Sequence, residues 1–212
     1  MIGNMTSWPA FLEQWSTEIL GIVRAAPKAL QDALVASSLE RGTILREPAS
    51  ADQVRAAEER LGVALPGSVK RFYEASNGLT LIAFDAVSNE LWPVEGISRF
   101  VDNEPGFVAD WEAETRPVPD EVYFDYGPRQ SSAAIRVDYL RTMWQLSPFV
   151  DAAVLLLNPN VIDERGEWEA WFLGVSLPGA RRFRGFEELM MYVRTMTVKS
   201  ARGAVEAKTT RS

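Results

Sequence analysis

Apolar residues between positions 50 and 62 recur at the spacing of one face of a helix. They are Val54, Ala57 and Leu61. Ser50 stands three residues before Gln53, the spacing of a capping box, in which two side chains satisfy backbone N–H groups at the start of a helix. Gly62 follows at a position where many helices end in a left-handed residue. The pattern therefore predicts a helix between Ser50 and Gly62.

A second, shorter helix is predicted directly after this one. Leu65 precedes Pro66, and a residue before proline is pushed out of the α region, so the chain should be extended at this step. The apolar face that follows is formed by Val69, Phe72 and Tyr73. The pair Asn77-Gly78 is a typical turn signal and is expected to end the helix.

The rest of the pattern predicts a helical N-terminal extension followed mostly by strands. Ser7 is placed to cap a helix whose apolar stripe consists of Trp8, Phe11, Trp15, Ile19 and Ile22. A second helix of the extension is expected from Pro27 to Gly42. Strand patterns occupy residues 79–84, 91–94, 122–126, 133–139, 152–157 and 168–175, and short helices are expected within 104–115 and 185–197. Residues 198–212 are polar and lack periodicity, which predicts a disordered tail.

The two helices around residue 62 resemble the opening of the SUKH superfamily. The motifs that carry the resemblance are LG-x-x-LP, from Leu61 to Pro66, and the Asn77-Gly78 pair. The likeness continues in Asn158-Pro159, in the segment 167–172 and in 185–189, and it covers about residues 48–197. Within the superfamily the match is to the Smi/Knr group, whose bacterial members are mostly immunity proteins against polymorphic toxins. The resemblance implies helices packed on an antiparallel sheet and a non-catalytic role in binding a toxin.

Three positions depart from the pattern of this group. An acidic residue is usual near Ser68, an aromatic residue or leucine near Val69, and a serine at Gly185. The departures predict weaker local capping of the helices within the same fold.

Negative charge is concentrated in residues 85–125. The acidic residues of this segment are Asp85, Glu90, Glu95, Asp102, Glu104, Asp110, Glu112, Glu114, Asp120, Glu121 and Asp125. Only Arg99 and Arg116 oppose these eleven, so the segment is net −9 (2 − 11), whereas the whole chain is net −7. Residues 180–212 are net +5, from eight Lys or Arg against three Glu. An acidic surface repels nucleic acid and attracts a basic partner, although a solvated face that keeps the protein soluble is an equal explanation.

Two of the seven tryptophans are candidates for partner contact. Trp111 lies inside the acidic segment, between Asp110 and Glu112. Trp171 is expected to share a strand face with Glu167 and Glu169, and so to be partly exposed. Tryptophan is enriched at binding hot spots, but it is equally suited to packing in a core, and the core role is favoured for each residue taken singly.

The residue types available exclude several kinds of catalytic site. The chain has no histidine and no cysteine, which excludes Ser-His-Asp and Cys-His nucleophilic sites and His/Cys zinc sites. Glu167 and Glu169 could form a carboxylate pair of the kind found in glycosidases. Asp163-Glu164 near Asn158 could offer oxygen ligands to a cation, although a polar hairpin loop explains these residues better.

We therefore expect an α+β fold, with helices packed on an antiparallel, twisted sheet of about six strands. The expected divisions are a helical N-terminal extension at 1–48, a SUKH-like domain at 49–197 and a disordered tail at 198–212. The N-terminus has no cationic region and no long apolar run, so we expect no cleaved signal peptide and a cytoplasmic location.

The resemblance and the charge together imply a non-catalytic immunity protein that binds and blocks a cognate bacterial toxin, such as a nuclease with a basic active-site cleft. The residues expected to contact this partner are Asp102, Glu104, Asp110, Trp111, Glu112, Glu114 and Trp171. A regulatory or adaptor module is the alternative, and a carboxylate-based hydrolase is a weaker one. We expect no cofactor, no metal, no nucleic-acid or membrane partner, and a monomer when the protein is free.

Overall fold

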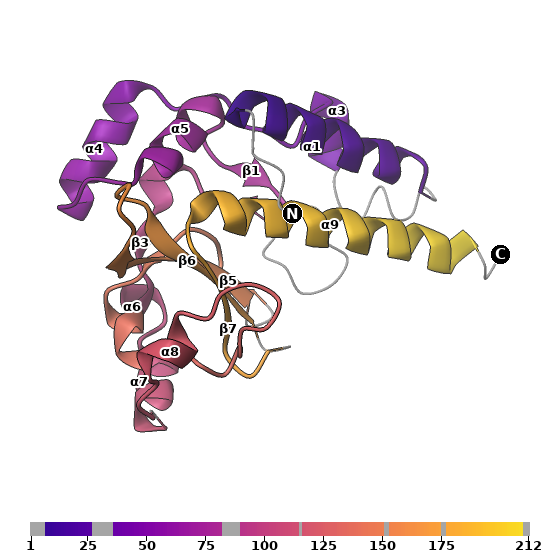
Figure 1. Ribbon diagram of the computed structural model, residues 1–212. Helices are drawn as coiled ribbons and strands as arrows, with labels where there is room; N and C mark the ends of the chain where they lie inside the picture. The colour runs from indigo at the N-terminus through magenta and orange to yellow at the C-terminus, as the bar shows by residue number, and fades with distance from the viewer. Residues whose placement is uncertain are drawn as a thin grey trace.

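The fold is α+β, as predicted. A computed structural model describes residues 7–26, 36–81, 90–114, 116–150, 153–174 and 177–209. Its main sheet has five antiparallel strands in the order β3-β4-β5-β6-β7, and a separate two-stranded sheet pairs β1 with β2. Figure 1 shows α1, α4, α5 and α9 on one side of the main sheet and α6, α7 and α8 on the other. The expected single sheet of about six strands is therefore divided into two sheets.

The N-terminal helix α1 (Trp8–Arg24) packs directly on the rest of the protein. Ser7 caps it by accepting a hydrogen bond from the Ala10 backbone N–H at 3.4 Å. Trp8 packs edge-on against Phe72 at a centroid distance of 5.1 Å and lies 5.5 Å from Phe186, so the extension shares one core with later elements. The second predicted helix falls largely on residues 27–35, which lie outside the described residues, and α3 (Ala36–Arg41) follows them.

Helices α4 (Ala51–Leu61) and α5 (Gly67–Ala75) confirm the two-helix prediction. Both hydrogen bonds of the Ser50/Gln53 capping box are present, and Gly62 ends α4 with a φ of 70°. Gly78, after α5, has a φ of 86°, and a Cβ there would lie 2.5 Å from the Leu91 carbonyl oxygen. The position therefore requires glycine, because only glycine allows β1 (Leu79–Thr80) to approach β2 (Glu90–Leu91) so closely.

The part of the chain between β2 and β5 contains short elements. They are the 3₁₀ helix η1 (Val94–Gly96), β3 (Ser98–Arg99), α6 (Phe100–Asn103), α7 (Pro105–Ala113), α8 (Asp120–Tyr123), η2 (Val137–Arg141) and β4 (Trp144–Gln145). The helix predicted within 104–115 is confirmed as α7.

The strands predicted at 122–126 and 133–139 are wrong. Pro119 followed by two acidic residues starts the helix α8, and Val122 and Phe124 are 42% and 43% exposed rather than paired in a sheet. The second segment forms turns and η2, and its apolar residues Ile135 and Val137 fill a core beneath the main sheet. Apolar residues alternate in both segments, but their backbones make local turn hydrogen bonds instead of strand pairing, such as those from the Phe124 N–H to the Asp120 carbonyl and from the Ala134 N–H to the Ser131 carbonyl.

The long strands β5 (Ala153–Ile162) and β6 (Trp168–Gly174) form the centre of the main sheet, and β7 (Ala180–Phe183) is an edge strand. The faces predicted for β6 are correct, because Trp168, Ala170 and Phe172 belong to the core on the α1 side. The opposite face is buried as well, beneath α6, α7, α8 and η2. Every residue of β6 is therefore buried, whereas a strand with one face in solvent would expose every second side chain.

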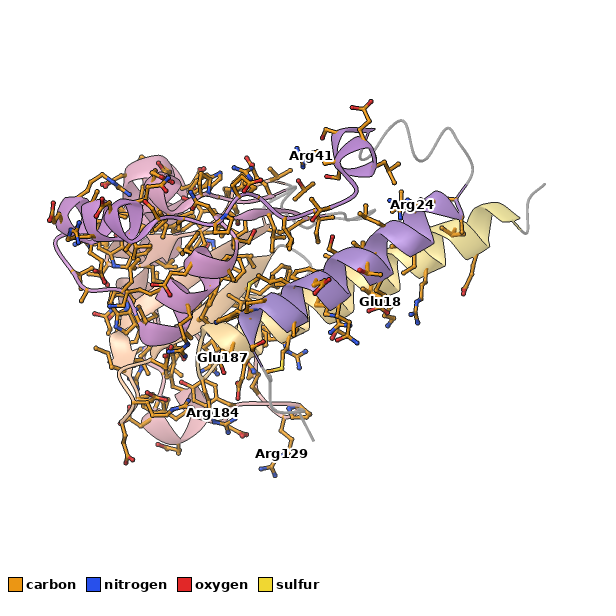
Figure 2. The ribbon with its side chains drawn as sticks, turned by 90° about the horizontal axis from the view of Figure 1, so that it is seen from above. Glu18, Arg24, Arg41, Arg129, Arg184 and Glu187 are labelled. Carbon is orange, nitrogen blue, oxygen red and sulfur yellow. The ribbon has the colours of Figure 1, made fainter. Side chains whose placement is uncertain are left out.

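Helix α9 (Phe186–Thr209) extends well past the helix predicted at 185–197. The prediction of a disordered tail is wrong up to residue 209, because Val198 and Ala201 are buried in the core shared with α1. Glu18 of α1 accepts hydrogen bonds from Arg194 and Arg202 of α9, each at 2.8 Å, and Figure 2 shows the two helices side by side. Among the described residues, no helix combines the length and apolar character needed to cross a bilayer.

Candidate protein-interaction surface

Helix α7 presents its apolar residues inwards and its acids outwards. Val108 is buried, whereas Phe107 and Trp111 are partly buried at the margin of the core below the sheet. The Phe107 ring stacks on the Trp111 ring with centroids 5.3 Å apart and an interplanar angle of 28°. Phe149 packs edge-on against Phe107 at 5.0 Å. These contacts hold the Trp111 indole in place while leaving part of it accessible.

All five predicted partner-binding acids lie on this side of the molecule, on or beside α6 and α7. We call Asp102, Glu104, Asp110, Glu112 and Glu114 the α6–α7 acidic surface. Asp102, Asp110 and Glu114 are exposed and Glu104 is partly exposed, and none of these four side chains has an ion pair among the described residues. Glu112 differs, because Arg141 donates to both of its oxygens at 2.5 Å, which raises the pKa of the arginine.

A hollow of about 370 Å³ opens beside Trp111. We call it the Trp111 hollow. Asp110 and Glu114 lie on its α7 side, together with Arg116 from the following loop. The apolar part of its lining is formed by Trp111, Val118, Ala133, Ile135, Val137 and Pro178. The surface therefore combines unpaired carboxylates, an aromatic ring and a recess, which suits contact with a protein partner.

Trp171 does not belong to this surface, and its prediction as a semi-exposed contact is wrong. Its exposed fraction is 0%, and its indole N–H donates to Glu169 Oε2 at 2.7 Å. The expectation assumed that one face of β6 is exposed to solvent, whereas α8 and its neighbours cover it. Trp171 is therefore a core residue.

Glu169 is the centre of a buried polar network. Besides Trp171, its carboxylate accepts hydrogen bonds from the Tyr123 hydroxyl at 2.6 Å, the Tyr126 hydroxyl at 2.8 Å and the Asn158 amide at 2.7 Å. Asn158 stands directly opposite Glu169 in the β5–β6 register. Four donors on one carboxylate are the arrangement that stabilises a buried negative charge.

Arg182 brings a positive charge to the same network. It pairs with Trp171 in the β6–β7 register, is 1% exposed, and holds its guanidinium 4.3 Å from the centroid of the Tyr123 ring. Its three guanidinium nitrogens make no hydrogen bond to any described residue. Burial, followed by the nearby Glu169 charge, raises the pKa of Tyr123 and of Tyr126 well above the ordinary value, so both hydroxyls stay protonated as donors.

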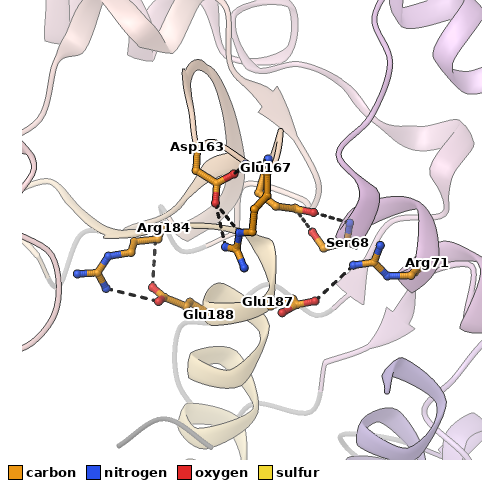
Figure 3. Close-up of polar contacts among 8 residues, drawn as sticks. Ser68, Arg71, Asp163, Glu167, Arg184, Glu187 and Glu188 are labelled. Atoms are coloured by element: carbon orange, nitrogen blue, oxygen red, sulfur yellow. Dashed lines mark hydrogen bonds and ion pairs between the residues drawn. The ribbon is translucent and has the colours of Figure 1, made fainter. Parts of the chain in front are cut away.

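Glu167 has a separate structural role and does not form a catalytic pair with Glu169. Figure 3 shows its carboxylate facing the first turn of α5, where it accepts hydrogen bonds from the Ser68 backbone N–H at 2.9 Å and from the Ser68 hydroxyl. The carboxylate that the family pattern places near Ser68 is thus supplied by the β5–β6 hairpin. Glu169 lies inside the protein, so the described structure offers no open site between the two carboxylates.

Asp163 closes the β5–β6 hairpin rather than offering its oxygens to a cation. Its side chain accepts hydrogen bonds from the backbone N–H groups of Arg165 and Glu167, each at 2.9 Å. Burial opposes the charged form of Asp163, but these hydrogen bonds and that from the Arg165 side chain outweigh it and lower the pKa. Among the described residues, no group of three or more acidic side chains is arranged to hold a metal ion.

The region that carries the α6–α7 acidic surface can be compared with known families. The family model described as SMI1 / KNR4 family (SUKH-1) matches residues 48–144. This region belongs to the SUKH-1 family. The matched residues include α4, α5, α7 and most of the Trp111 hollow, so the candidate surface is part of the SUKH-1 region. SUKH domains are known as a type of immunity-protein domain and are generally non-catalytic. No curated protein matches the chain.

The sequence shows the acids of the α6–α7 acidic surface and Trp111, but it does not show the recess beside them. Val118, Ile135 and Pro178 meet at the Trp111 hollow from three separate segments, and no local pattern in the sequence announces such a meeting. The apolar residues at 133–139 are the one signal of it in the sequence, and their alternation is also typical of a strand.

Proposed function

We propose that this protein, through its SUKH-1 region, is a non-catalytic immunity protein that binds and neutralises a cognate bacterial toxin. The observation that carries the proposal is the α6–α7 acidic surface, where four carboxylates have no ion pair among the described residues and two of them, Asp110 and Glu114, lie beside the partly buried Trp111 within the family-matched region. An exposed group of unpaired charges contributes little to folding, so a binding role accounts for the arrangement better than a structural one.

The proposed partner is a toxin with a basic active-site cleft, of which a nuclease is the leading example. Enzymes that bind nucleic acid need positive charge in their cleft. An inhibitor with a complementary acidic surface associates quickly, because the opposite charges steer the encounter. The α6–α7 acidic surface would occupy the place of the anionic substrate, and the bulk of the domain would block access to the cleft.

Trp111 is proposed as the aromatic anchor of this contact. It is held by the Phe107 stack, so little conformational freedom is lost when a partner binds it. Its neighbours Asp110 and Glu114 surround it with charge, which matches the arrangement of a hot spot within a polar rim. We propose that the free protein is monomeric and cytoplasmic, where it would meet the toxin before the toxin acts.

The test starts from the genes that neighbour the gene for this protein: if one of them encodes a toxin domain, that domain is co-expressed with the protein. The proposal expects cells to survive the toxin only when the protein is present, and the purified pair to form a stable complex in which the toxin is inactive. A complex that leaves the toxin fully active would favour the adaptor alternative. Absence of both protection and binding would refute the proposed function.

A further inference from the structure

The Trp111 hollow has walls of two chemical kinds. Its apolar side is formed by aliphatic and aromatic side chains from the 118 loop, the 133–137 segment and Pro178, together with Trp111. Its charged side holds the carboxylates of Asp110 and Glu114, neither of which has an ion pair among the described residues. A ligand that fills it must therefore bring an apolar stem and a positive end.

We propose that the Trp111 hollow is a receptor for one arginine side chain of the partner protein. This rests on the proposed function and deepens it, because it names the group on the basic partner that the surface recognises. The three methylenes of the arginine would lie on Val118 and Ile135, and the guanidinium would reach the carboxylates of Asp110 and Glu114.

Arginine fits these walls better than lysine. Its guanidinium is planar and more weakly hydrated than an ammonium, so it stacks on an aromatic ring and pairs with carboxylates at a lower desolvation cost. The indole of Trp111 is fixed by Phe107 on the α7 side and still contributes to the wall of the hollow. A hollow of about 370 Å³ also exceeds the volume of one side chain, so the bound group can keep part of its hydration.

Arg116 allows the effect of charge on binding in the Trp111 hollow to be tested. It lines the same hollow, is exposed, and has no ion pair among the described residues, so it repels an incoming cation and offsets one of the two acids. If the hollow receives arginine, removal of Arg116 strengthens binding, whereas removal of Asp110 or Glu114 weakens it. A surface that binds cations only through the overall acidic field would not require the shape or the tryptophan.

The experiment titrates the full-length, ¹⁵N-labelled protein with Nα-acetyl-arginine amide and follows the indole N–H signal of Trp111 by NMR. That signal is assigned by its absence in Trp111→Phe. The matched probes are Nα-acetyl-citrulline amide, which has nearly the same shape without the charge, and Nα-acetyl-lysine amide. The protein variants are Asp110→Asn combined with Glu114→Gln, Arg116→Gln, and the control Asp138→Asn, an exposed acid that follows the lining residue Val137 in the chain but does not line the hollow itself.

We expect saturable binding of the arginine probe, with affinity for the citrulline probe lower by about tenfold and for the lysine probe by about threefold. The double acid variant should weaken arginine binding by about tenfold, Arg116→Gln should strengthen it by about twofold or more, and Asp138→Asn should leave it unchanged. Equal shifts with the arginine and citrulline probes, no saturable shift at Trp111, or equal losses in the double variant and Asp138→Asn would each overturn the proposal.

Two further comparisons are needed. The first distinguishes an arginine side chain of a protein from free arginine, and the second tests the arginine receptor separately from the immunity function. Free arginine should bind no more tightly than the capped probe, and a strong preference for the free amino acid would replace the partner side chain by a small metabolite. Toxin neutralisation by Asp110→Asn/Glu114→Gln at the parental level would overturn the arginine receptor and leave the immunity function standing. If the arginine probe binds as expected but the protein does not bind the toxin, the arginine receptor stands and the immunity function is refuted.

Discussion

Two five-residue segments of nearly the same composition have opposite environments in this protein. Residues 110–114 read Asp-Trp-Glu-Ala-Glu, and residues 167–171 read Glu-Trp-Glu-Ala-Trp. The first lies on α7 and continues into the loop after it, with Asp110 and Glu114 open to solvent. The second runs into β6, where Glu169 and both tryptophans are buried. Similar residues thus form a surface in one place and a core in the other.

The difference lies in the hydrogen-bond donors that each segment meets. Glu169 receives donors from four residues and has the buried Arg182 charge in the same network. On α7, Glu112 is the one acid with a charged partner among the described residues, Arg141, and the pair lies at the surface. A carboxylate beside a tryptophan can therefore be buried only where the surrounding elements supply enough donors. Where they do not, the carboxylate stays in water and is free to bind a partner.

The largest expected effect on folding stability comes from replacing the buried carboxylate of Glu169. Glu169→Gln removes the negative charge from the network that also holds the buried Arg182 and brings an amide N–H₂ group against four donors, so we expect a loss of about 3–5 kcal/mol in the free energy of unfolding. Urea denaturation followed by circular dichroism measures it. The matched surface variant, Glu114→Gln, should unfold at nearly the parental urea concentration. Equal, small losses in both would mean that the network does not stabilise the fold.

Replacing the buried Trp171 should also cost more folding stability than replacing Trp111 at the surface, but the difference should be smaller than that between Glu169 and Glu114. Trp171→Ala removes a fully buried ring and one donor to Glu169, which should cost about 3–5 kcal/mol. Trp111→Ala removes a partly buried ring that stacks on Phe107, and we expect a loss of about 1–2 kcal/mol together with weaker toxin binding. Chemical denaturation of both variants and calorimetric titration with the toxin provide the comparison. A Trp111→Ala protein as unstable as Trp171→Ala would place this residue in the core rather than at the interface.

The buried network should also make the protein sensitive to alkaline pH. Burial first, and Glu169 second, raise the pKa of Tyr123 and Tyr126, so these hydroxyls bind protons more tightly in the folded state than in the unfolded state. Their stabilising contribution is complete below the unfolded-state pKa of about 10 and is lost progressively as the pH rises above it. Urea denaturation at a series of pH values from about 8 to about 11 should show the decline. Tyr123→Phe should make it shallower, and an unchanged slope would contradict the assignment.

The elements that could be predicted from the sequence have local signals of their own. The capping box at Ser50, the glycine at 62 and the apolar face of α5 are read from neighbouring residues, and α4 and α5 form as expected. The strands β3 and β4 have two residues each, too few to produce a detectable period, and they form because β5 lies beside β4. The extension of α9 depends on α1, which covers Val198 and Ala201. Where the local pattern does not specify an element, as in β3, β4 and the end of α9, contacts with segments distant in the sequence determine its structure.

In the candidate site too, some features could be predicted from the sequence and others depend on distant contacts. The acids and Trp111 could be proposed from the sequence because charge and residue type are visible there, and a short helix is expected within 104–115. The burial of Trp171 could not, since it depends on α8 and its neighbours covering the second face of β6. The role of Glu167 at the start of α5 joins residues 99 positions apart. Such partners are known only once the fold is known.

Neutralising the exposed acids should have the smallest effect on folding. The variant combines Asp102→Asn, Glu104→Gln, Asp110→Asn and Glu114→Gln, and it keeps the Glu112–Arg141 pair intact. Because these side chains have no ion pair among the described residues, we expect an unfolding midpoint close to that of the parent in urea. A large loss of stability would show that the α6–α7 acidic surface is required for the fold, and the comparison with the buried network would fail.

The association rate of this four-acid variant with the toxin tests the central claim most directly. Stopped-flow fluorescence at a series of salt concentrations measures the rate for the parent and the variant. If the α6–α7 acidic surface steers the encounter, the parent associates at least about tenfold faster than the variant at low salt, and its rate falls steeply as salt is added. The variant should show little salt dependence. Equal rates for the two proteins at low salt would contradict the claim and place toxin recognition on another surface.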